Sequence, residues 1–267
     1  MSKNNYYDDV KVIKKPLKKR LKHFLNFLCI ASVFAGVIAV SFYLSDALVV
    51  GNLTNALVYG DTKVVRNAHS VYAVILGEYD SMNEAETVAM GSSIQGASGY
   101  VWQGEKYYVI GSIYFALSDA EAVIKNLEGS NYSLNIMTIE FDKININFGD
   151  LENKEVGDIE ASLDFIDELS QTIYNQSISY DKGESNNFAI SSEISSLRGQ
   201  AKIHISNLQK LQKDKFIDEI QNSMILIDEL LDEAILKTIE NSTTNYSLKN
   251  TLARLVRIKY DLYNNLK

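Results

Sequence analysis

The residues best suited to acid–base chemistry in this 267-residue chain are three pairs of adjacent carboxylates in its C-terminal half. The pairs are Asp167-Glu168, Asp228-Glu229 and Asp232-Glu233. Hydrolysis of a glycosidic bond needs two such groups placed across a cleft. These pairs instead fall in segments of helical periodicity, where carboxylates commonly cover a solvated face. We therefore expect a protein that is not an enzyme.

Histidine and cysteine are too sparse to suggest a metal or redox site. His23, His69, His204 and Cys29 do not stand at the spacings of metal ligands. The sequence also has no phosphate-binding loop, no H-E-x-x-H helix and no G-x-S-x-G turn. His204 lies on an apolar helical stripe, where a packed or hydrogen-bonded core residue is expected. No metal and no cofactor are predicted.

The charge distribution argues against nucleic acid as a partner. The net charge of the chain is −8, but residues 1–23 alone carry +6, whereas residues 45–140 and 141–267 carry −7 each. Binding to a phosphate backbone needs clusters of Lys and Arg on the binding domain. Lys outnumbers Arg, and Asn, Ile and Tyr are abundant, which is typical of the AT-rich genome of a low-GC, Gram-positive-type bacterium.

The basic N-terminal segment precedes a candidate membrane span. Residues 24–44 contain no charged side chain, and about 20 apolar residues suffice to cross a bilayer core. Because Lys and Arg beside a span stay in the cytoplasm, the N-terminus is expected inside and the bulk of the chain outside. A cleaved signal peptide is the alternative, although the apolar run is long for one.

A strand–helix unit occurs twice, thirty-five residues apart. The matching positions are Tyr72, Val74, Ile75, Tyr79, Ala85, Glu86 and Val88 in the first copy, and Tyr107, Val109, Ile110, Tyr114, Ala120, Glu121 and Val123 in the second. Internal repetition specifies architecture before any single residue is interpreted. With two further strands, the repeat predicts an α+β fold with a ferredoxin-like β-α-β-β-α-β sheet.

Alternation, turns and capping patterns give the expected bounds of these elements. Both helices are expected to begin with a capping box, at Asn83–Glu86 and at Ser118–Glu121. The expected strands are His69–Gly77, Tyr100–Gln103, Lys106–Tyr114 and Leu134–Phe141, and the expected helices are Asn83–Gln95 and Asp119–Leu127.

Four segments of this region resemble a SPOR domain, the sporulation and cell-division repeat of bacterial envelope proteins. The segments are Tyr72-Ala-Val-Ile-Leu-Gly-Glu-Tyr79, Gly96-Ala-Ser-Gly-Tyr100, Lys106-Tyr-Tyr-Val-Ile-Gly-Ser-Ile-Tyr114 and Asp119-Ala-Glu-Ala-Val123. These motifs are diffuse rather than diagnostic. A membrane anchor followed by an external module is also the usual arrangement of the family.

The resemblance implies binding to peptidoglycan, in particular to glycan strands stripped of their stem peptides, through the open face of the sheet. Tyr and Trp rings suit sugars because they offer an apolar face and a polar tip. By alternation, the candidate glycan-binding residues are Ala73, Ile75, Tyr100, Trp102, Tyr108, Ile110 and Ser112.

The sequence departs from the family at two of these positions. The family often has Gln where this chain has Ile75, and Gly where it has Ser112. Ile75 and Ile110 make the face more apolar than a sugar site usually is. The alternative interpretation is therefore an envelope scaffold, in which this face packs on the C-terminal helices or on a second copy and binds no glycan.

The period of the apolar residues changes from two to three or four after the boundary segment 142–157. One stripe includes Ile159, Leu163 and Ile166, and another includes Leu252, Leu255 and Lys259. Such stripes indicate a helical bundle over residues 158–267, with a possible docking surface for another envelope protein. The pattern leaves open whether residues 188–240 form one helix or two.

The expected organisation is thus a single-pass cell-membrane protein with a role in division or sporulation. Its expected parts are a basic cytoplasmic tail (1–23), a transmembrane helix (24–44), a tether (45–66), a SPOR-like domain (67–141), a linker (142–157) and a helical bundle (158–267).

Overall fold

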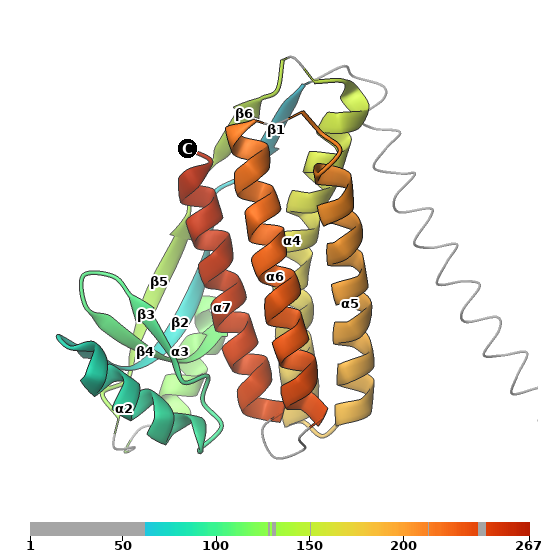
Figure 1. Cartoon of the computed structure of the whole chain (residues 1–267). Helices are drawn as coiled ribbons and strands as arrows, with labels where there is room; N and C mark the ends of the chain where they lie inside the picture. The colour runs from blue at the N-terminus through green and yellow to red at the C-terminus, as the bar shows by residue number, and fades with distance from the viewer. Residues whose placement is uncertain (1–61, 128, 130–131, 150, 213, 240–243) are drawn as a thin grey trace, which may run out of the picture. The chain divides into compact units, whose positions relative to one another are not determined.

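The computed structural model describes residues 62–127, 129, 132–149, 151–212, 214–239 and 244–267. An α+β region of strands and short helices occupies residues 63–147, and four long helices follow over residues 153–265 (Figure 1). None of the described helices is long and apolar enough to cross a bilayer. The expected tail and transmembrane helix (1–44) lie outside the described residues.

A four-stranded antiparallel sheet forms the centre of the α+β region. Its strands adjoin in the order β3-β4-β2-β5. Along the chain the elements are β2 (His69–Tyr79), α2 (Met82–Ser93), β3 (Tyr100–Gln103), β4 (Tyr107–Tyr114), α3 (Leu117–Asn126) and β5 (Asn135–Phe141). The predicted β-α-β-β-α-β order is therefore confirmed.

The two short helices begin earlier than the predicted capping boxes. The Ser81 hydroxyl accepts a hydrogen bond from the Glu84 backbone N–H at 3.3 Å, so α2 begins at Met82. Ala116 precedes α3 and offers no side-chain cap. Because Asn83 and Ser118 lie inside the first turns, the capping boxes predicted there are wrong. The sequence pattern was displaced by one or two residues, a common error at helix ends.

Two further strands were not predicted. β1 (Lys63–Arg66) pairs antiparallel with β6 (Ile144–Asn147) in a separate two-stranded sheet. β1 lies in the segment expected to be a tether, and β6 lies in the expected linker. Val64, Ile144 and Ile146 are buried, and their alternation with exposed residues is the pattern of a half-buried strand.

The C-terminal region contains four helices. The segment 188–240, for which the sequence left open one helix or two, forms two, α5 and α6. The helices are α4 (Asn153–Asp181), α5 (Asn187–Leu208), α6 (Lys215–Ile239) and α7 (Thr244–Asn265). α5 packs on α6 and α4, and α7 packs on α6 and α4, so the four helices form a closed bundle. The predicted apolar stripes are buried along it.

The sheet and the bundle share one hydrophobic core. One face of the sheet contributes Ile75, Ile110 and Phe141 to a cluster that continues into the bundle through α7. The opposite face packs on α2 in a smaller cluster that includes Leu76, Ala85 and Val109. In Figure 1, α7 lies between the strands and the other long helices. α7 is therefore a core element of both regions.

Candidate functional site: the sheet face beneath α7

Six of the seven residues predicted to bind glycan lie on one face of the sheet, beneath α7, but the prediction for Ser112 is wrong. Ser112 pairs with Val74, whose side chain alternates with those of Ala73 and Ile75, so a register shift between Val74 and Ile75 places Ser112 on the opposite face. Ala73, Ile75, Trp102 and Ile110 are buried, and Tyr100, Tyr108 and Ser112 are half-buried. All except Ser112 belong to the core that the sheet shares with the bundle. Among the described residues, this face of the sheet is thus a packing surface rather than an open platform for a ligand.

Trp102 shows how α7 covers the face. Its side chain is 5% exposed and lies edge-on to Tyr260, with ring centroids 5.3 Å apart. The Arg257 guanidinium lies 4.9 Å from the indole centroid, within the range of a cation–π interaction. Arg257 also donates a hydrogen bond to the Gln103 carbonyl at 2.9 Å. The indole ring that a sugar would use is therefore already engaged by side chains of α7.

The loop between α2 and β3 binds the first half of α7. The Asn250 amide donates to the Ser98 carbonyl at 2.8 Å, and the Lys249 ammonium donates to the Gly96 carbonyl at 3.2 Å. Gly99 has φ +59°, and a Cβ there would lie 2.9 Å from the Ala89 carbonyl oxygen. A side chain at this position would be strained and would clash. This glycine therefore lets the loop approach both α2 and α7.

An ionic cluster around the buried Lys259 joins the sheet to both α4 and α7. The Lys259 ammonium on α7 lies 2.8 Å from an Asp167 carboxylate oxygen on α4 and 2.8 Å from His69 Nε2 on β2. The Tyr263 hydroxyl donates to Asp167 at 3.2 Å. Lys259 is only 4% exposed, so its charge depends on these partners. The cluster therefore fixes the relative position of three elements from distant parts of the sequence.

Arg66 extends this cluster to β1. Its guanidinium forms an ion pair with Asp164 at 2.8 Å and lies 3.9 Å from Asp167. It also donates to the Glu160 backbone carbonyl at 2.9 Å. Burial raises the pKa of the Asp164 carboxyl, and the positive charge of Arg66 opposes that change. Arg66 thus attaches the end of β1 to the outer face of α4.

Hydrogen bonding determines the protonation of His69. Lys259 can only donate, so Nε2 of His69 must accept, and Nδ1 carries the proton that faces the Asn67 carbonyl at 3.2 Å. Burial lowers the pKa of His69, and the charge of Lys259 lowers it further. Burial and the nearby Asp167 charge raise the pKa of the Tyr263 hydroxyl, which stays a donor. The hydrogen bonds of the cluster therefore require the neutral form of His69.

A second histidine, His204, behaves as predicted for a core residue. Its Nδ1 lies 3.2 Å from the Ser162 hydroxyl, and its ring packs against Phe165 with centroids 4.9 Å apart. Burial lowers the pKa of His204. Both histidines therefore favour the neutral form in the folded state.

Stability should consequently fall when the pH drops from 7.5 to 5.5. The unfolded chain takes up protons near pH 6.5, whereas folded His69 and His204 resist protonation until lower pH, so acid favours unfolding in this window. Urea unfolding at three pH values measures the slope. His69→Gln and His204→Gln should each make the slope shallower. An unchanged slope in both variants would contradict a neutral, buried state for these rings.

The contacts among Arg66, Asp167 and Lys259 were not predicted: Asp167 was assigned to a solvated helix face, and Lys259 was named only as a member of an apolar stripe. A signal was present for Lys259, because it occupies a position on the apolar stripe of the last helix, where a charge requires a buried partner. Within the described part of the chain, no group of His, Cys, Asp and Glu side chains could hold a metal ion. Lys259 is the buried member of the ionic cluster, whereas the side chains of Asp167 and Asp164 are 31% and 41% exposed.

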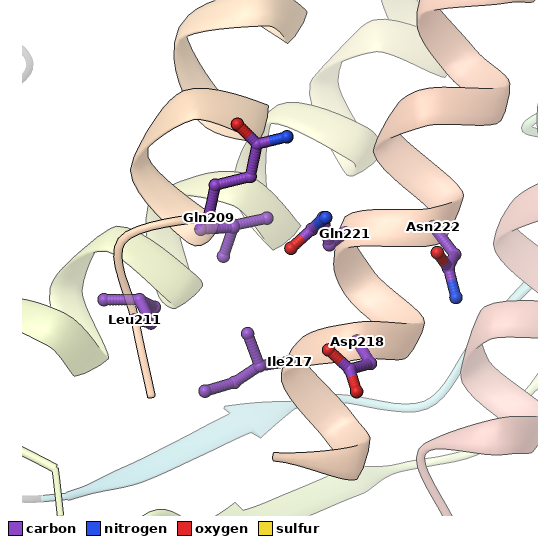
Figure 2. Close-up of a pocket in the computed structure, with 7 residues that line it drawn as sticks. Gln209, Leu211, Ile217, Asp218, Gln221 and Asn222 are labelled. Atoms are coloured by element: carbon purple, nitrogen blue, oxygen red, sulfur yellow. The ribbon is translucent and has the colours of Figure 1, made fainter. Parts of the chain in front are cut away.

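Two surface hollows lie on either side of the turn between α5 and α6. The larger, of about 420 Å³, is lined by residues of the α5 end and of the first turns of α6 (Figure 2). The smaller, of about 170 Å³, lies beside β6 and includes Phe148 and Phe216. Neither hollow is lined by any of the predicted glycan-binding residues.

Comparison of the chain with models of protein families finds no match, and comparisons with curated proteins and with solved structures find none either.

Proposed function

We propose that the chain is a non-enzymatic scaffold or interaction protein of the bacterial cell envelope, anchored in the membrane by residues 24–44. Its external part is a ferredoxin-like module fused through α7 to a helical bundle. Partner binding then uses the outer surfaces of this joint unit, whereas the sheet face serves as core. This is the envelope scaffold that the apolar character of Ile75 and Ile110 made the alternative to glycan binding.

The observation that carries this proposal is the burial of Ile75 and Ile110 against a helix of the bundle. Ile75 is 4% exposed and Ile110 is fully buried, in one core with residues of α7. Polar contacts from Arg257 and Asn250 surround this apolar contact. Buried aliphatic side chains surrounded by hydrogen-bonded polar groups are typical of a permanent interface rather than of a sugar-binding site.

Peptidoglycan binding is the second candidate. The element order and the strand order β3-β4-β2-β5 favour it, because they match the ferredoxin-like module that the SPOR resemblance implies. On this hypothesis the module would locate the protein to denuded glycan strands at division or sporulation sites. A glycan could reach the sheet face only if the sheet separated from α7.

Trp102 distinguishes the two candidates because it is the only tryptophan of the chain. In the scaffold, its emission in the full-length protein in detergent should not change when soluble denuded glycan is added. Retention on sacculi should be equally low before and after amidase treatment. Binding that increases after amidase treatment, together with a red shift of Trp102, would overturn the scaffold in favour of the glycan reader.

A pair of double variants makes this experiment sharper. Asn250→Ala with Arg257→Ala removes polar contacts between α7 and the sheet. Gln200→Ala with Lys202→Ala changes exposed residues of α5 and serves as the matched control. For a scaffold, both double variants should bind sacculi as weakly as the parent. For a glycan reader masked by α7, only the first pair should increase binding.

A further inference from the structure

The larger hollow beside the α5–α6 turn has an apolar floor and a polar rim. Leu208 and Ile217 are each 1% exposed and form the floor. In Figure 2, Ile217 and Gln221 project from α6 toward the turn that carries Gln209, with Asp218 and Asn222 beside them on α6. This combination of an apolar base with a few polar groups is typical of small binding sites.

The polar side chains of the rim lack intramolecular partners. Among the described residues, no hydrogen bond or ion pair involves the side chains of Gln209, Asp218, Gln221 or Asn222. The lining also includes one carboxylate and no Lys, Arg or His. The rim can therefore accept hydrogen bonds from a cation, and the only charge it presents is negative.

We propose that this hollow binds the side chain of a lysine presented by a partner protein. An ammonium group has three N–H donors, and the rim offers three acceptor groups: the Asp218 carboxylate and the amide carbonyl oxygens of Gln221 and Asn222. The aliphatic part of the lysine would lie along Leu211, the half-buried apolar residue of the lining, as such stems commonly do on apolar surface. Within the described part of the chain, the lining carries a single charge, the negative charge of Asp218, which is complementary to an ammonium group.

This inference rests on the proposed interaction role and gives it a location on the bundle. The partner would present a lysine on an exposed segment, and the side chain of this lysine would enter the hollow of about 420 Å³. The site lies outside the sheet face, so it does not depend on contact between α7 and the sheet.

Carbodiimide coupling tests the site because it joins an amine to a carboxylate that it contacts. The full-length protein in detergent is treated with N-acetyl-lysine methylamide, and peptide mapping measures coupling at Asp218 and at Glu229, an exposed carboxylate of the same helix. Methylamine, which has a cation but no aliphatic stem, corrects for intrinsic reactivity. Coupling at Asp218 should exceed that at Glu229 by at least about tenfold after correction, the factor that one charge-assisted hydrogen bond contributes.

The variant Gln221→Leu with Asn222→Leu removes two acceptors and leaves Asp218 in place, so the preference for Asp218 should disappear. Equal corrected coupling at the two carboxylates in the parent, or an unchanged preference in the variant, would overturn the lysine site. Loss of coupling at Asp218 on addition of N-acetylglucosamine oligomers would overturn it in favour of a saccharide site. Trp102 emission in the same samples reports separately on the sheet and α7, so failure of the lysine site leaves the scaffold proposal testable.

Discussion

Replacing Ile110 with alanine should lower the free energy of unfolding by about 2–5 kcal/mol, the range for a buried isoleucine truncated in a packed core. Ile110 is fully buried on the sheet face, in the core shared with α7. The surrounding side chains come from two regions of the chain, so they cannot easily collapse into the space left by the missing carbons. Urea unfolding followed by circular dichroism and by Trp102 emission measures the change.

The matched control is Ile94→Ala, because Ile94 is 84% exposed at the end of α2. Its truncation should change the free energy of unfolding by no more than about 0.5 kcal/mol. The two probes should report one transition for the Ile110 variant, because loss of the shared core affects sheet and helices together. An Ile110 variant as stable as the Ile94 variant would contradict packing of the sheet face against the bundle.

Replacing Lys259 with methionine should also lower the free energy of unfolding, by about 1–3 kcal/mol, because contacts of a buried ammonium group are lost while the Asp167 carboxylate keeps some solvent contact and the Arg66 guanidinium at 3.9 Å. Without Lys259, the Asp167 carboxylate loses its partner at 2.8 Å, and His69 Nε2 loses its donor. Methionine retains most of the volume and apolar surface of the lysine stem, so the change isolates the ammonium group. Equilibrium unfolding in urea at pH 7.5 measures it.

Lys202→Met is the corresponding control, because Lys202 is exposed on α5. It should leave stability nearly unchanged. If the Lys259 variant were as stable as the parent, the cluster would be a dispensable ion pair. A stability that is restored by the second change Asp167→Leu would instead support the cluster, because an apolar pair of similar volume avoids the uncompensated charge.

Except for Ser112, which a register shift turns to the other face, the sequence predicted which candidate residues share a face of the sheet, but it did not decide what covers that face. Strand alternation correctly grouped Ile75 with Trp102 and Ile110, because side-chain direction follows the period of two. An apolar strand face has the same pattern whether a ligand, a helix or a second copy lies on it. The deciding information is on α7, more than a hundred residues away, and no local period connects the two.

The ionic contacts between the sheet, α4 and α7 could not be predicted either, because their members are far apart in the sequence. Lys259 stands on the apolar stripe of the last helix, but its partners Asp167 and His69 come from two other elements. β6 was assigned to a linker because residues 142–157 are rich in Asn, Gly and charged side chains, although Ile alternates there with Asn, which is the pattern of a strand with one buried face. Pairing with β1 stabilises it, and a pair of four-residue strands has no distinctive signal in a sequence.

The position of α7 in the chain also has a consequence for how the protein folds. The hydrogen bond from Asn250 to Ser98 spans 152 residues, and the sheet face cannot be covered until a helix that far along the chain is available. Folding rates fall as contacts become more distant in sequence. A nascent chain that does not yet include α7 is therefore an intermediate in which Ile75 and Trp102 lack this cover. Such an intermediate exposes an adhesive surface, so the time between synthesis of the sheet and docking of α7 is when this protein is most vulnerable to aggregation.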